Sequence, residues 1–201
     1  MHKQLKLFIL SIFLLPGLYK AQAQVITSLE EVQPYFYNLP LSASKEALLQ
    51  EAKRQFPNNT IDSFKIIGNS KVYFEDTTVV YDYFHKRPIR ATLRIFQYLP
   101  KANAFQNDTA LHVQVSAFYG TGKKAKRHMY NTYSTLRDLL NGKFAQQSSA
   151  CIFAARQVGS FTSFSMQDTM HAPRVVVCWD KDGSLPLCLA SITFIQPSQE
   201  R

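Results

Sequence analysis

The chain has 201 residues, of which 46% are hydrophobic and 13% aromatic, and its formal net charge is +9. This apolar content suffices for a packed core and excludes an intrinsically disordered chain. The length corresponds to one domain or to two small ones.

The first residues have the pattern of a secretory signal peptide. Residues 1–6 are basic, residues 7–18 form an apolar run, and Ala21-Gln22-Ala23 supplies the small residues of a cleavage site. The run is shorter than the roughly 20 residues that span a bilayer, and no later run is long enough. We therefore expect residues 1–23 to be removed and residues 24–201 to be exported to the periplasm or the outside of a bacterial cell.

Export changes how the charge is interpreted. The signal peptide holds three lysines and no acid, so the mature chain carries +6 (9 − 3). Export also makes nucleic acid an unsuitable partner and leaves anionic surfaces outside the cytoplasm as candidates.

The first predicted helix follows an extended lead-in. Residues 24–40 are expected to be extended because Pro34 and Pro40 interrupt helices. Ser42 or Ser44 can cap a helix that continues to Phe56. Its apolar stripe consists of Leu48, Leu49, Ala52 and Phe56.

A series of strands and a second helix follow. Strands are predicted at 63–67, 71–75, 78–84, 89–99 and 111–117, and 71–75 with 78–84 can also form one bent strand. After Gly120-Thr121-Gly122, apolar residues recur at helical spacing and predict a second helix; they are Met129, Tyr133, Leu136, Leu140 and Phe144. Asn141-Gly142 can end this helix or mark a weak point near its end. Three strands are predicted to close the chain, at 158–166, 174–179 and 187–195.

This order predicts an α+β fold with antiparallel sheet packed by two helices. Residues 24–201 form a single predicted domain. The halves 41–120 and 121–197 have the same order of elements, which suggests a degenerate tandem of helix-plus-meander units.

The three cysteines allow one disulfide bond. Folding the last two strands about Gly183 places Cys178 opposite Cys188, where a cross-strand bridge can form. Cys151 then remains free or pairs between chains. The alternative is that all three are buried apolar groups.

Two basic clusters are the candidate binding residues. Lys123, Lys124, Lys126, Arg127 and His128 lie in the predicted first turns of the second helix, where the helix dipole disfavours cations. A phosphate or a carboxylate would relieve that conflict, and a solvated loop is the alternative. The second cluster consists of Lys86, Arg87, Arg90 and Arg94.

Known catalytic and metal motifs are absent from the sequence. The glycine loop before the second helix lacks the composition of a nucleotide-binding loop, and Asp180-Lys181-Asp182-Gly183 lacks the twelfth-position acid of a calcium loop. There is no zinc-binding motif and no G-x-S-x-G. We therefore expect no cofactor, no metal and no catalytic residue.

The sequence favours a non-enzymatic binding module. Its partner would be an envelope or extracellular protein or an anionic surface. The alternative is an envelope hydrolase with a thiol nucleophile such as Cys151.

Overall fold

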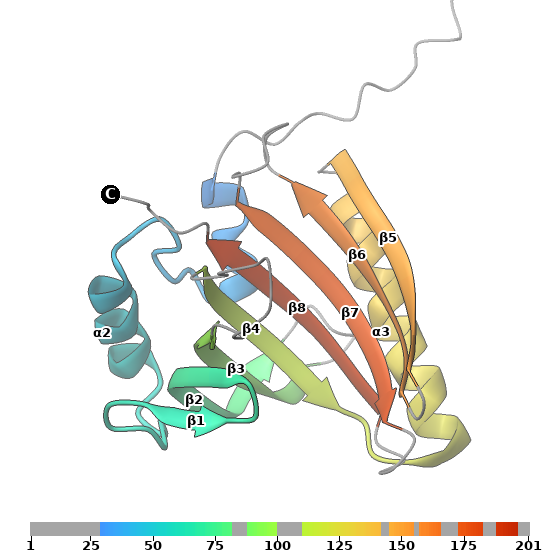
Figure 1. The fold of residues 1–201 in the computed structure, drawn as a ribbon, viewed down its shortest axis with the longest axis horizontal. Coiled ribbons are helices and arrows are strands. Elements are labelled where there is room, and N and C mark those ends of the chain that lie inside the picture. Colours follow the sequence, from blue (N-terminus) through green and yellow to red (C-terminus); the bar gives the residue numbers. More distant parts are fainter. Residues whose placement is uncertain are drawn as a thin grey trace, which may run out of the picture.

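The structure is a computed structural model, and it describes residues 29–81, 88–99, 110–141, 145–154, 157–165, 173–182 and 188–196. Within these residues the chain forms an antiparallel sheet with helices packed against it (Figure 1), which confirms the α+β class. The predicted signal peptide, Lys86 and Arg87 lie outside the described residues.

The lead-in is helical where the sequence predicted an extended segment. It contains the 3₁₀ helices η1 (Leu29–Glu31) and η2 (Gln33–Phe36). Pro34 lies in the first turn of η2, where proline is tolerated because the first N–H groups have no partner within a helix. Tyr35 and Phe36 are buried, so this segment contributes to the core.

Helix α2 (Lys45–Gln55) begins where the capping pattern predicted. Ser44 is its N-cap, and the Ser44 hydroxyl oxygen accepts a 3.3 Å hydrogen bond from the main-chain N–H of Ala47. Leu48 and Ala52 are fully buried, which orients the helix toward the sheet.

The strands of the first half form a meander, and they are β1 (Lys65–Ile67), β2 (Ser70–Tyr81), β3 (Ile89–Tyr98) and β4 (Leu111–Phe118). The run at 71–75 and the described part of the run at 78–84 belong to one strand, β2, which the structure describes up to Tyr81. This strand has register shifts at Val72/Phe74 and Asp76/Val79. Beside the second shift, the Asp76 carboxylate accepts a 2.7 Å hydrogen bond from the main-chain N–H of Thr78.

Helix α3 (Gly122–Asn141) opens the second half, and its buried stripe follows the predicted spacing. The strands after it are β5 (Ala145–Ala154), β6 (Gln157–Ser165), β7 (Arg174–Asp182) and β8 (Cys188–Gln196). The sequence analysis did not predict β5, because its polar first half does not alternate with apolar residues.

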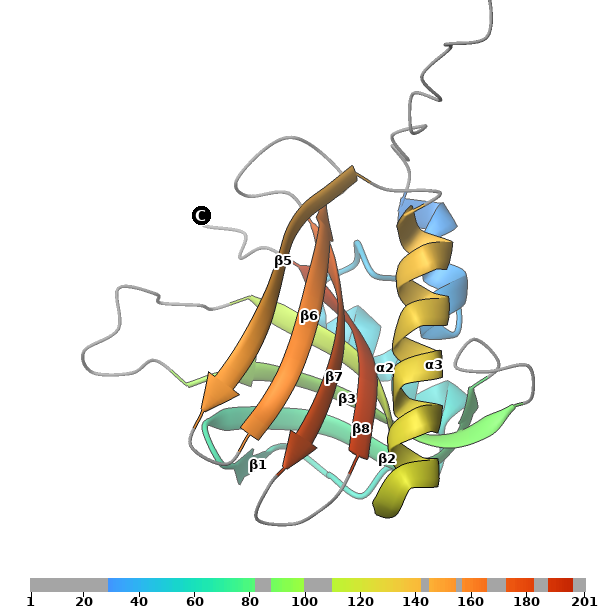
Figure 2. The same ribbon diagram turned by 90° about the vertical axis from the view of Figure 1, so that its right-hand side faces the viewer.

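All eight strands form one sheet in the order β1-β2-β3-β4-β8-β7-β6-β5. Two meanders therefore meet where β4 pairs with β8. Helix α3 lies against β7 and β8, and α2 lies against β2 (Figure 2). No described helix is long and apolar enough to cross a membrane.

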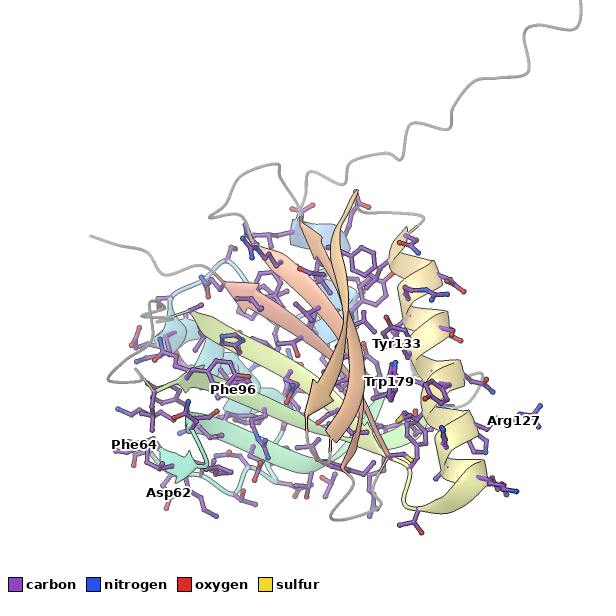
Figure 3. The ribbon with its side chains drawn as sticks, turned by 45° about the vertical axis from the view of Figure 1, so that its right-hand side comes forward. Asp62, Phe64, Phe96, Arg127, Tyr133 and Trp179 are labelled. Atoms are coloured by element: carbon purple, nitrogen blue, oxygen red, sulfur yellow. The ribbon has the colours of Figure 1, made fainter. Side chains whose placement is uncertain are left out.

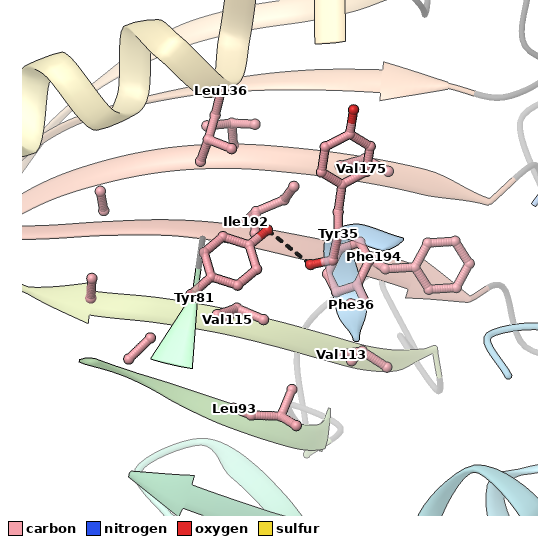
Figure 4. Packing of buried hydrophobic residues seen from close by; sticks show 14 of the residues in the cluster. Tyr35, Phe36, Tyr81, Leu93, Val113, Val115, Leu136, Val175, Ile192 and Phe194 are labelled. Atoms are coloured by element: carbon pink, nitrogen blue, oxygen red, sulfur yellow. Dashed lines mark hydrogen bonds between the residues drawn. The ribbon is translucent and has the colours of Figure 1, made fainter. Parts of the chain in front are cut away.

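One face of the sheet contributes to a single hydrophobic cluster with the helices. On β4, Leu111, Val113, Val115 and Ala117 belong to this cluster. In the interior, Phe36 of η2 packs edge-to-face against Phe194 of β8, with ring centroids 6.0 Å apart (Figure 4). We call the opposite side of the sheet the polar face; its side chains in the central strands are Thr92, Arg94, Gln114, Ser116, Phe118, Ser191 and Thr193. Thr92, Ser116, Ser191 and Thr193 are buried.

The predicted disulfide bond between Cys178 and Cys188 is wrong, because the two cysteines are not bonded to each other. Cys178 lies opposite Ser191, and Cys188 lies opposite Lys181. The turn is therefore centred beyond Gly183, and an odd shift in register moves a side chain to the other face of the sheet. Cys188 belongs to the core cluster, whereas Cys178 lies on the polar face.

Candidate functional site

The start of α3 is held in place by contacts to the sheet. The main-chain N–H of Tyr119 donates to the carbonyl of Cys188, and the N–H of Cys188 donates to the carbonyl of Gly120, both at 2.9 Å. Gly120 and Gly122 have φ values of +79° and +88°, a region that side chains with a Cβ rarely adopt. These contacts and dihedral angles fix where the chain turns from β4 into α3.

The first basic cluster lies on the outer side of this helix start. Ala125 and Met129 are buried against the sheet and anchor the first turns. Lys123, Lys124, Lys126 and Arg127 are exposed, and Figure 3 shows Arg127 directed away from the sheet. We call these four residues the α3 basic cluster. The structure therefore brings together the predicted residues of the first turns on a solvent-facing surface.

The electrostatic conflict predicted for this helix start is present. The first turn of α3 contains no acidic residue. Within the described ranges, no carboxylate lies within ion-pair distance of the α3 basic cluster. Its positive charges therefore add to the positive end of the helix dipole without local neutralisation.

Aromatic rings lie next to the α3 basic cluster and to His128. The Lys126 ammonium lies 5.6 Å from the centroid of the Tyr130 ring, and Tyr130 packs edge-to-face on Trp179 at 4.6 Å. His128 is half-buried and its ring lies parallel to that of Tyr119, with centroids 6.4 Å apart. His128 thus packs against the end of β4, whereas the four exposed cations face the solvent.

Tyr119 also links the turn to the body of α3. Its hydroxyl group contacts the Thr132 hydroxyl. Burial raises the pKa of Tyr119, and the hydrogen bond to Thr132 opposes part of that shift. Tyr119 is therefore neutral at physiological pH and contributes no charge to the cluster.

The second predicted cluster is divided by the structure. The Arg94 guanidinium binds the Glu75 carboxylate, with an Nε–Oε2 distance of 2.7 Å, so this arginine is neutralised within the sheet. Arg90 is exposed and lies opposite Val80. Since Thr92 pairs with Ser116, Arg90 lies toward the end of β4 from which the chain enters α3. Arg90 and the α3 basic cluster therefore share one end of the sheet.

Two exposed hydrophobic side chains at this end were missed by the sequence analysis. Val80 is 58% exposed and Phe118 is 59% exposed. Phe118 lies on the same face of β4 as the polar residues His112, Gln114 and Ser116, because even-numbered residues of this strand share one face. Its position on that face was the available signal. The small hydrophobic cluster on that face consists of Ile61, Val72 and Phe96 and does not include Phe118.

The strand register shows which residues lie in the same row of the sheet as Cys151. This cysteine pairs with Ser160, which pairs with Trp179, so the row contains no histidine. His112 lies in a different row, opposite Ile195, and stacks on Phe96 at 5.0 Å. In the part of the chain that the structure describes, no group of three or more His, Cys, Asp or Glu residues could hold a metal ion.

Asp180, Lys181 and Asp182 continue β7 as strand residues. A strand backbone keeps successive side chains on opposite faces, unlike a calcium-binding loop, whose ligands converge.

No protein-family model, no curated protein and no solved structure matches this chain.

Proposed function

We propose that the chain is an exported, non-enzymatic binding module whose α3 basic cluster contacts an anionic surface. That surface belongs to an envelope or extracellular protein or to lipid headgroups. The observation that supports this function is the presence of four exposed cations at the positive end of a helix, with no carboxylate partner in the described residues.

Retaining four cations at this position destabilises the helix start. Each cation near a helix N-terminus costs about 0.3–1 kcal/mol. An anionic partner converts that unfavourable field into attraction, because both the side chains and the helix N–H groups favour negative charge. The cluster is therefore better suited to a complex than to the isolated chain.

A variant with four substitutions tests this function. Replacing Lys123, Lys124, Lys126 and Arg127 by serine is expected to abolish binding to vesicles of phosphatidylglycerol in phosphatidylcholine and to immobilised heparin. Each cation near an anionic lipid surface contributes about 1 kcal/mol, so the loss for vesicles approaches roughly a thousandfold. Comparison of the binding to heparin with the binding to vesicles distinguishes a polyanionic glycan from a lipid surface as the partner.

The matched control removes the same charge elsewhere. Lys53, Arg54, Lys65 and Lys71 lie on α2 and on the β1–β2 hairpin. Replacing these four by serine lowers the net charge equally and leaves the α3 basic cluster intact. Equal losses in both variants would mean that net charge alone governs binding and would overturn the proposed site.

We also propose that the two halves of the chain derive from one helix-plus-meander unit. A twofold rotation about an axis between β4 and β8 places the strands β1-β2-β3-β4 in the positions of β5-β6-β7-β8. This internal symmetry of the strand order supports a common origin. Residues 41–120 and 121–197, coexpressed as separate chains, are then expected to reassociate through β4 and β8. Failure of the coexpressed halves to associate would count against two self-contained units.

A further inference from the structure

One end of the sheet combines positive charge with exposed apolar side chains. It consists of the last residues of β2 and β4 and the first residues of β3 and β8, and we call it the α3 end of the sheet. Figure 1 shows β4 leading from this end into the first turn of α3. Two of the six large hydrophobic side chains that are exposed among the described residues, Val80 and Phe118, lie here beside the α3 basic cluster.

Strand pairing brings Val80, Arg90 and Phe118 onto one face of the α3 end. Arg90 lies opposite Val80. Thr92 lies opposite Ser116, so the same antiparallel register, continued by two residues, places Arg90 next to Phe118. Alternate residues of a strand share a face, so Val80, Arg90 and Phe118 all belong to the polar face of the sheet. An exposed cation therefore lies between two exposed apolar side chains.

This apolar row borders the turn that leads into the α3 basic cluster. Gly122, where α3 begins, follows Phe118 by four residues. On β8, the partner of Phe118 is the partly buried Leu189. The adjacent Cys188 donates its main-chain N–H to the carbonyl of Gly120 at 2.9 Å, which fixes the turn against the sheet. The apolar row and the α3 basic cluster therefore hold a defined position relative to each other.

Cations outnumber acids at the α3 end. The α3 basic cluster supplies four exposed cations and Arg90 supplies a fifth. Strand β7 ends here with Asp180, Lys181 and Asp182, which together carry a net charge of −1. These residues therefore leave a net charge of +4 (5 − 1), which attracts an anionic partner.

We propose that the α3 end of the sheet docks on an anionic lipid bilayer, with the Phe118 and Val80 side chains inserted among the headgroups. This inference rests on the binding role proposed above for the α3 basic cluster and identifies its partner as a membrane surface. Interfacial binding strengthens both with the apolar area inserted and with attraction to anionic lipids. A soluble polyanion such as heparin offers charge without an apolar layer, so it would leave Phe118 and Val80 in water. The combination of side chains at this end therefore favours a bilayer.

A distant corner of the sheet supplies a matched control. Phe64 and Ile66 are 51% and 50% exposed, close to 59% for Phe118 and 58% for Val80. Ile66 lies opposite Lys71 at the start of β2, whereas Val80 lies near the end of that strand. The Lys71 ammonium lies 4.1 Å from the centroid of the Phe64 ring, so this corner also combines apolar groups with a cation. Only its distance from α3 sets it apart in the experiment.

The experiment compares the native protein with two double variants, Val80→Ser with Phe118→Ser and Phe64→Ser with Ile66→Ser. Cosedimentation with vesicles of phosphatidylglycerol in phosphatidylcholine measures binding at low and at high salt, and heparin binding is measured in parallel. All proteins are expressed from the full coding sequence. Vesicles of phosphatidylcholine alone report any binding through the apolar run at residues 7–18, which every variant shares.

The double variant at Val80 and Phe118 is expected to bind the anionic vesicles roughly tenfold more weakly than the native protein, because it loses the inserted apolar surface. That loss should persist at high salt, since salt screens charges and leaves apolar contacts in place. Heparin binding of this variant should equal that of the native protein. The double variant at Phe64 and Ile66 should match the native protein with both ligands.

A tryptophan probe tests insertion directly. The sequence contains a single tryptophan, Trp179, which is 9% exposed, so the native protein gives the background. Phospholipids brominated on their acyl chains should quench additional fluorescence in Phe118→Trp. In Phe64→Trp they should quench no more than the background. Both substitutions keep an aromatic side chain at an exposed position, so neither removes a buried contact.

Native vesicle affinity in the double variant at Val80 and Phe118, or no additional quenching in Phe118→Trp, would overturn insertion. Equal losses of heparin and vesicle binding in that double variant would overturn it too. These outcomes leave the function of the α3 basic cluster to the variant with four serines. Native protein that binds heparin and ignores vesicles would overturn a membrane partner and leave the proposed function standing, with a glycan or an anionic protein as the partner.

Discussion

The hydroxyl group of Tyr81 donates a 2.8 Å hydrogen bond to the main-chain carbonyl of Tyr35 in the buried core (Figure 4). This bond ties the 3₁₀ segment η2 to the end of β2, across 46 residues of sequence. Tyr81 is 1% exposed, so water cannot replace the donor if it is removed.

Tyr81→Phe is therefore expected to destabilise the fold by about 1–3 kcal/mol, the typical cost of an unsatisfied buried acceptor. Urea unfolding followed by circular dichroism measures this loss. Thr135→Ala is the control, because the exposed Thr135 hydroxyl donates to the carbonyl of Asn131 at 2.8 Å and solvent can replace it. Equal losses in the two variants would contradict the role of burial.

The N-cap of α2 gives a second prediction. Ser44→Ala removes the acceptor of the Ala47 N–H and should cost about 1 kcal/mol of unfolding free energy. Ser42→Ala, at the exposed alternative position, should change the unfolding free energy little. A larger effect at Ser42 than at Ser44 would mean that the helix begins earlier than the structure shows.

Alkaline pH should weaken the fold through tyrosines whose burial raises their pKa. Burial raises the pKa of Tyr119 above that of the unfolded chain, and it also raises the pKa of Tyr73 and of Tyr130. Their contribution is constant below the unfolded pKa of about 10 and is lost as the pH rises through the folded pKa. The urea midpoint is therefore expected to fall above about pH 10, and to fall less steeply in Tyr119→Phe. An identical slope in that variant would exclude a contribution from Tyr119.

The cysteines give a fourth prediction. Protein that is denatured without a reducing agent is expected to react with a thiol reagent at both Cys178 and Cys188. In the folded protein Cys188 is 1% exposed and should react much more slowly than Cys178. Mass spectrometry of the labelled peptides measures both. A peptide pair linked through Cys178 and Cys188 would contradict the register of β7 and β8.

Local signals predicted much of the fold. The cap at Ser44 and the stripe through Leu48 and Ala52 identified α2, because these patterns depend on neighbouring residues alone. Of the two roles predicted for Asn141-Gly142, an end or a weak point, the structure has the end, because the last residue of α3 is Asn141. The position of the α3 basic cluster at a helix start followed directly from these boundaries.

Longer-range properties could not be predicted in this way. The helical turn at Pro34 depends on burial of Phe36 against Phe194, which lies far away in sequence. Pairing of Cys178 with Ser191 depends on how many residues the turn contains, and one odd shift reverses the face. The neutralisation of Arg94 by Glu75 required the register of β2 and β3.

The salt dependence of vesicle binding tests the central claim most directly. The native protein should bind phosphatidylglycerol vesicles with an affinity that falls steeply as salt is raised, because salt screens exposed charges. The variant lacking Lys123, Lys124, Lys126 and Arg127 should show weak binding and a nearly flat dependence, while the variant lacking Lys53, Arg54, Lys65 and Lys71 should follow the native curve. Native affinity and an unchanged salt dependence in the first variant, for vesicles and heparin alike, would contradict a binding role for the start of α3.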